Sequence, residues 1–250
     1  MSPIAICLIA FLCIFGSALA GIFIRELLPE HLLSEDSKKI LETARSVVVG
    51  LAALTLGLLI ATAKTSFDTK DTELKASGAK MVTLNRLLLK YGGESQKARD
   101  TLRQIGVTGI ALIEKIGQEG MDRKAVGGEG LDQLMSQLME LPERNASQTW
   151  LKSSALSLGN EIALSRWKIY ESSSSTVSPL FLSVLVFWLM TIFFSIGLIA
   201  PLNASVFAAL FTAAISMTGA ILLTLELDQP YGGLIRMSTE PLKMALQQLR

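Results

Sequence analysis

The chain has 250 residues, half of them hydrophobic, and its 23 basic and 22 acidic residues leave a net charge of +1. A nearly neutral chain has no electrostatic basis for binding nucleic acid, so we expect no nucleic-acid partner. With one histidine and with Cys7 and Cys13 inside an apolar run, the sequence offers no metal-ligand cluster and no nucleophile–base pair. We therefore expect no enzyme, no metal and no other cofactor.

Three stretches of the sequence contain no charged residue: 1–24, 46–63 and 172–225. A charge near the middle of a bilayer costs at least ~2.5–3.5 kcal/mol, and ~20 apolar residues suffice to cross the hydrocarbon core. The last run is long enough for two crossings. We predict an all-α integral membrane protein that crosses the lipid bilayer four times, with a helical module between spans two and three.

Span one is predicted over residues 3–24. A cleaved signal peptide is the competing interpretation, because Ala18 and Ala20 match a cleavage-site pattern. No lysine or arginine precedes the apolar stretch, which favours a retained span. After the polar segment that follows, Ser34, Glu35 and Asp36 have the pattern of a helix start.

Span two is predicted over residues 46–63 and is rich in small residues. A spacing of four places Ala53, Gly57 and Ala61 on one helix face, near Gly50. Two interpretations stay open. Small residues allow close packing of helices within one subunit, which we favour, or they line a narrow axial pore.

The polar module is predicted over residues 64–176. Apolar periodicity indicates four helices, with breaks at Gly92–Gly93, at Gly120, at Gly127–Gly130 and at Pro142. No break separates span two from the first of these helices, so one continuous helix should leave the membrane. The stripe of the second helix is expected to include Leu112.

Spans three and four are predicted over residues 177–200 and 204–225, with a tight hairpin at 201–203. Thr212 and Ser216 place hydroxyl groups on one face of span four. Such a stripe is more often a contact between helices, but in a ring of subunits it becomes a conduit lining. We therefore keep both residues as pore-lining candidates.

The segment 226–250 forms the predicted tail. Glu226 and Asp228 oppose the helix dipole where span four ends, and Arg236 follows a Pro–Gly-Gly turn as their candidate partner. We favour a structural lock of the tail over a vestibule charge cluster or cation site. A final amphipathic helix should follow Pro241, with apolar residues Leu242, Ala245, Leu246 and Leu249 on one face.

Four spans put both termini and the 64–176 module on one side of the membrane. Basic residues near the spans number nine on that side and four on the other, a bias typical of the cytoplasmic side. The nine are Lys64, Lys70, Lys75, Lys80, Arg166, Lys168, Arg236, Lys243 and Arg250, and the four are Arg25, Lys38, Lys39 and Arg45. We expect a cytoplasmic module with cytoplasmic termini.

Three stretches resemble a bacterial family of unknown function that carries the label "bestrophin-like". They are residues 197–203, residues 226–236, and Leu84-Asn85-Arg86-Leu87 with Tyr91-Gly92 and Arg99. The resemblance spans nearly the whole chain and implies an inner-membrane protein with span two at the pore. True bestrophins are pentameric anion channels. Unlike them, this sequence has no aromatic neck in span two and no acidic calcium-clasp run.

The predicted topology and the family resemblance are compatible with two functions. The first is a homo-oligomeric ion channel, with a pore along span two continued by a cytoplasmic vestibule. The permeant ion is an anion by resemblance and a cation by the carboxylates of Glu226 and Asp228. The alternative is a non-conducting membrane scaffold or signalling protein that binds a partner through its helical module. The absence of ionisable residues from the spans fits this alternative.

Overall fold

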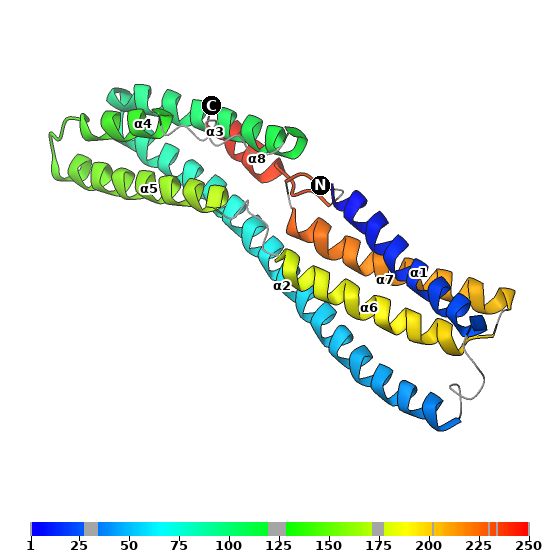
Figure 1. The fold of residues 1–250 in the computed structure, drawn as a ribbon. Coiled ribbons are helices and arrows are strands. Elements are labelled where there is room, and N and C mark those ends of the chain that lie inside the picture. The colour runs from blue at the N-terminus through cyan, green and yellow to red at the C-terminus, as the bar shows by residue number, and fades with distance from the viewer. Residues whose placement is uncertain are drawn as a thin grey trace. The chain divides into compact units, whose positions relative to one another are not determined.

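The structure, a computed structural model, describes residues 2–27, 35–119, 129–171, 178–201, 203–229, 231–233 and 235–249. Within these residues the chain is entirely helical and contains no strand, which confirms the predicted all-α class (Figure 1). The helices are α1 (Pro3–Leu27), α2 (Glu35–Tyr91), the 3-10 turn η2 (Gly93–Ser95), α3 (Gln96–Glu119), α4 (Glu129–Met139), α5 (Ala146–Glu171), α6 (Pro179–Ile199), α7 (Ala204–Asp228) and α8 (Glu240–Gln247).

The chain divides into two compact units. The membrane unit comprises Met1–Ser66 and Thr176–Asp228, and the module unit comprises Phe67–Ser175 and Gln229–Arg250. The single helix α2 contributes its first part to the membrane unit and its second part to the module unit. The predicted continuity of this helix is confirmed. It begins at Glu35, as the start pattern indicated, whereas Ser34 lies outside the described residues.

Four helices are long and apolar enough to cross a membrane: α1, α2, α6 and α7. This confirms the four predicted spans. Helix α1 packs against both α6 and α7, and the three helices lie side by side in Figure 1. Ala18, one of the two residues of the cleavage-site pattern, is fully buried in this packing.

A tight connection joins α6 to α7. Helix α6 ends where Pro201 follows, because proline disfavours a helical conformation in the residue before it. The backbone N–H of Asn203 donates to the carbonyl of Pro201 at 2.9 Å, and the carbonyl of Asn203 then accepts the N–H of Phe207 at 3.1 Å. The predicted hairpin is thus confirmed at Pro201 and Asn203, and Leu202 lies outside the described residues.

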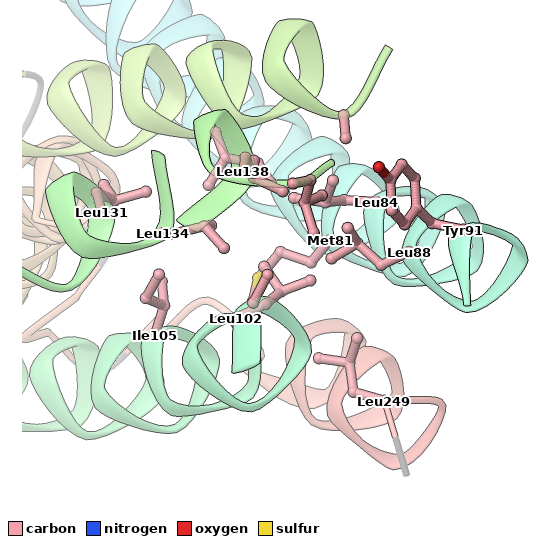
Figure 2. Packing of buried hydrophobic residues seen from close by; sticks show 14 of the residues in the cluster. Met81, Leu84, Leu88, Tyr91, Leu102, Ile105, Leu131, Leu134, Leu138 and Leu249 are labelled. Carbon is pink, nitrogen blue, oxygen red and sulfur yellow. The ribbon is translucent and has the colours of Figure 1, made fainter. Parts of the chain in front are cut away.

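The core of the module unit forms where α2, α3, α4 and α5 meet. Figure 2 shows leucines from three of these helices, together with Leu249 from the tail, converging on one cluster. The predicted apolar stripes fill it: Leu84 and Leu88 on α2, Leu102 on α3, and Leu134 on α4 are all essentially inaccessible to solvent. Periodic leucines therefore position the helices of this unit.

Two details of the module prediction are wrong. Leu112 is only partly buried, whereas Ile110 and Ile113 face a second cluster that contains Tyr231 and Leu242 of the tail. The stripe of α3 therefore turns toward the tail instead of continuing along the four-helix core. Gly130 lies inside α4, so the helix begins one residue before that predicted break. The predicted breaks at Gly120 and Gly127 lie outside the described residues.

Candidate functional site

The small-residue face of α2, defined as Gly50, Ala53, Gly57 and Ala61, is exposed along its whole length. A Cβ atom added to Gly50 or Gly57 would meet no atom of the described residues within 4 Å. The opposite face of α2 carries Val48, Ala52, Leu56 and Leu59, which pack on the core of the membrane unit. The favoured interpretation, tight packing of the small residues within one subunit, is therefore wrong.

Helix α7 also leaves its hydroxyl stripe exposed. Thr212 donates its hydroxyl hydrogen to the carbonyl of Ala208, and Ser216 donates to the carbonyl of Thr212, both at 2.9 Å. Each hydroxyl is thereby satisfied by its own helix and keeps a free lone pair toward the outside. Such a surface tolerates lipid, a neighbouring helix or water.

The close helix contact in the membrane unit lies between α1 and α6, where we did not predict it. A Cβ atom on Gly21 would overlap the backbone carbonyl oxygen of Phe194, and one on Gly197 would overlap that of Ala18. The hydroxyl of Ser17 lies 2.7 Å from the carbonyl oxygen of Ile14 in its own helix and 3.0 Å from that of Met190 on α6, so its single hydrogen is shared between the two. The four-residue spacing of Ser17 and Gly21 was the available sequence signal.

Arg25 secures the far end of the same helix pair. Its guanidinium donates to the carbonyl of Ala200, the residue that caps the C-terminus of α6. A cation at a helix C-terminus interacts favourably with the helix dipole, and this carbonyl has no partner within its own helix. The ends of α1 and α6 are therefore fixed to each other next to the hairpin.

Both acidic residues at the end of α7 are buried. Glu226 and Asp228 are each 3% exposed, and both take part in interactions within the protein. Arg236, the predicted partner, is exposed, and its Nε donates to the carbonyl of Gly233 at 3.0 Å. The single chain therefore already encloses both side chains.

A polar contact ties the tail to the module. Asn85 is buried on α2, where its amide oxygen accepts the Nε–H of Arg99 at 3.0 Å and its amide nitrogen donates to the carbonyl of Gln248 at 3.3 Å. One side chain therefore joins α2, α3 and the residue that follows α8. Asn85 and Arg99 both belong to the third of the stretches that carry the resemblance noted from sequence.

The residues described by the structure include no group of three or more histidine, cysteine, aspartate or glutamate side chains that could hold a metal ion. The candidate site is a surface. It consists of the small-residue face of α2 and the hydroxyl pair Thr212 and Ser216 of α7, all uncharged and all exposed in the single chain. Such a surface can border a pathway or a neighbouring subunit, but it cannot supply acid–base chemistry.

Comparison with known proteins gives one family and one fold. The family model for the bestrophin-like domain matches residues 11–242. Two crystal structures of a bacterial bestrophin homologue from Klebsiella pneumoniae, each with one substitution, are similar in fold. Their TM-scores are 0.64 and 0.63 at 15% identity, covering 97% and 94% of this chain and 97% of each of those chains. No curated protein matches. The chain belongs to the bestrophin-like family.

Proposed function

We propose that this protein is a homo-oligomeric ion channel in which the small-residue face of α2 lines the pore. The observation that carries the proposal is the exposure of Gly50, Ala53, Gly57 and Ala61 on a helix that is long and apolar enough to cross a membrane. A face of small residues that is exposed in the described part of its own chain is suited to a narrow axial path between several copies of α2.

A ring of subunits needs two different surfaces on each copy, since a head-to-tail contact closes only when one surface meets another. Helix α5 offers such a surface in the module unit: Trp150, Leu164 and Trp167 are exposed at helical spacing, with Trp150 at 63%. Exposed groups of large apolar side chains are typical of protein interfaces. This pattern supports an assembly of copies of the chain.

We infer that the module and both termini are cytoplasmic and that the protein lies in a bacterial inner membrane. The support is the bias of nine basic residues on the module side against four on the other side. A cysteine-labelling experiment on intact cells tests this: Ser157→Cys on the exposed surface of α5 should stay protected from an impermeant reagent. Labelling of this variant before permeabilisation would show that the module lies on the opposite side of the membrane.

The sign of the permeant ion follows from two arguments of unequal weight. The resemblance to bestrophins implies an anion. The argument for a cation rests on Glu226 and Asp228, and the burial of both side chains in the single chain does not support it. We infer instead that these carboxylates anchor the end of α7. Exchanging them for Gln and Asn should lower the melting temperature without shifting the reversal potential. A shifted reversal potential with an unchanged melting temperature would show that these carboxylates line the conduction path.

The decisive experiment is the reversal potential of the purified protein in a planar bilayer under a KCl gradient. Gly57→Leu should abolish or alter the current, because leucine side chains from each subunit would meet in the pore. Gly16→Leu is the matched control, since Gly16 is also an exposed intramembrane glycine with no atom of the described residues near its Cβ position. Its current should be normal.

Three outcomes contradict or redirect the proposal. Equal currents from the wild type and Gly57→Leu would show that the small-residue face of α2 does not line the pore. Equal loss in both variants would show that any enlarged intramembrane glycine disturbs the assembly. Silence from well-folded wild-type protein would favour the second candidate, a non-conducting scaffold, which the exposed tryptophans of α5 also suit.

A further inference from the structure

A small hollow lies between three helices of the module unit. Its volume is about 270 Å³, and it is lined chiefly by polar side chains of α3, α4 and α5, among them Thr101, Gln104, Thr108, Gln133 and Arg166. Ligand pockets for drug-sized molecules start at roughly 300 Å³, so this hollow is sized for a smaller molecule. The channel proposal makes no use of it.

Arg166 is the charged centre of the hollow. Its guanidinium is partly buried on α5, and it forms no ion pair and no hydrogen bond with any residue that the structure describes. Burial lowers the pKa of Arg166 below its usual value, because the charged form loses hydration. The group remains charged near neutral pH, and no interaction within the described residues occupies its N–H donors, so they are available to a ligand.

The groups around Arg166 define what could satisfy it. The hydroxyls of Thr101 and Thr108 donate to backbone carbonyls of their own helix, at 3.0 and 2.9 Å, and keep only acceptor lone pairs for a ligand. The side-chain amides of Gln104 and Gln133 offer N–H donors. A fork of guanidinium donors with nearby amide donors suits the oxygens of a planar or tetrahedral oxyanion.

We propose that this hollow binds a small oxyanion, a phosphate or a carboxylate, with Arg166 as its principal ligand. The acceptor hydroxyls of Thr101 and Thr108 suit a ligand that keeps one O–H, as hydrogen phosphate or a hydroxy acid does. The volume matches inorganic phosphate or a short carboxylate. Glu129 also borders the hollow, and its carboxylate repels an anion and limits the affinity.

The test is thermal unfolding and calorimetric titration of the full-length protein in detergent, with sodium phosphate, sodium acetate and sodium chloride as probes at one ionic strength. A ligand that binds only the folded state raises the melting temperature. We expect phosphate or acetate to do so, and chloride not to. A larger shift with phosphate would identify a phosphate site, and a larger shift with acetate would identify a carboxylate site.

Two variants and one control assign the binding to this hollow. Arg166→Gln should weaken binding tenfold or more, because a charge-assisted hydrogen bond is lost. Glu129→Gln should tighten binding several-fold, since it removes a like charge from the rim. Arg103→Gln, which removes an exposed arginine of α3, should bind as the wild type does.

Either of two results would overturn the proposal. The first is that neither phosphate nor acetate binds the wild type at tens of millimolar. The second is that binding is unchanged in Arg166→Gln or falls equally in Arg103→Gln. If Arg166→Gln fails to fold, Glu129→Gln decides alone: weaker or unchanged binding in that variant would refute the assignment. None of these measurements depends on current, so they are independent of the channel proposal.

Discussion

Glycines of the membrane unit occur in two surroundings that look alike in sequence. At the α1–α6 crossing, Gly21 and Gly197 bring two backbones so close that no side-chain atom fits. On α2, Gly50 and Gly57 face nothing in the described part of their own chain. The comparison shows that the spacing of small residues does not tell whether another helix of the same chain lies opposite them.

The largest effect should come from closing the space at the α1–α6 crossing. Gly197→Ala places a methyl group against the carbonyl oxygen of Ala18, and a backbone carbonyl cannot move aside as a flexible side chain can. We expect a loss of about 3 kcal/mol or more in the free energy of unfolding. Thermal unfolding in detergent measures it. A variant as stable as the wild type would show that the two helices do not cross here.

Tyr231, a buried residue of the tail, makes the free energy of unfolding depend on pH in the alkaline range. Burial raises the pKa of Tyr231 from its usual value near 10 to about 12. The folded state then binds the phenol proton more tightly than the unfolded state. This stabilisation is complete below pH 10 and is lost as the pH rises through 12, by roughly 3 kcal/mol at most. Unfolding measured from pH 9 to 12 should show the loss in the wild type.

Tyr231→Phe is the control for this titration. The hydroxyl of Tyr231 has no hydrogen-bond partner among the described residues, so its removal should cost little at neutral pH. The variant should lose less stability than the wild type between pH 10 and 12. Identical pH profiles in the two proteins would mean that the phenol is hydrated in solution.

A matched pair on α3 repeats the comparison of closed and open glycines within one helix. Gly106→Ala places a methyl group 2.5 Å from Cδ2 of Leu246 and 2.9 Å from Cε of Met81, both flexible ends. We expect a loss of about 1 kcal/mol. Gly109→Ala meets nothing within 4 Å of the described residues and should gain about 0.5–1 kcal/mol in helix propensity. Equal changes in both would show that α8 does not pack on Gly106.

The smallest effect on subunit stability should come from Gly57→Ala. Its new methyl group meets no atom of the described residues, so the stability of the subunit should not fall, and any change should stay within the gain of about 0.5–1 kcal/mol expected from helix propensity. Conductance is the sharper measurement, since a methyl group from each copy narrows a shared axial path. A large fall in subunit stability would mean that this face of α2 is packed within the chain.

Local signals predicted most of the fold. Charge-free runs located the four spans, because the cost of burying a charge in lipid acts on each residue separately. Pro201 fixed the hairpin, and leucine periodicity located the helices of the module. The start of α2 at Glu35 followed from the same kind of signal.

The partner of each face could not be predicted, because it depends on contacts between residues far apart in the chain. Gly57 and Gly197 differ only in what lies opposite them. For the same reason the sequence suggested Arg236 as the counterpart of Glu226 and Asp228, whereas Arg236 contacts its own turn. The sequence indicated Arg166 only as one of the basic residues near the spans. Its place in a polar hollow depends on three helices and could not be predicted.

The position of Leu249 has a consequence for how the protein is made. This residue belongs to the core that also contains Leu88 and Leu102, and Gln248 beside it accepts the amide of Asn85. The ribosome synthesises α2 to α5 first, then α6 and α7, and these last residues afterwards. The module core therefore stays incomplete until α6, α7 and the residues after them have been synthesised.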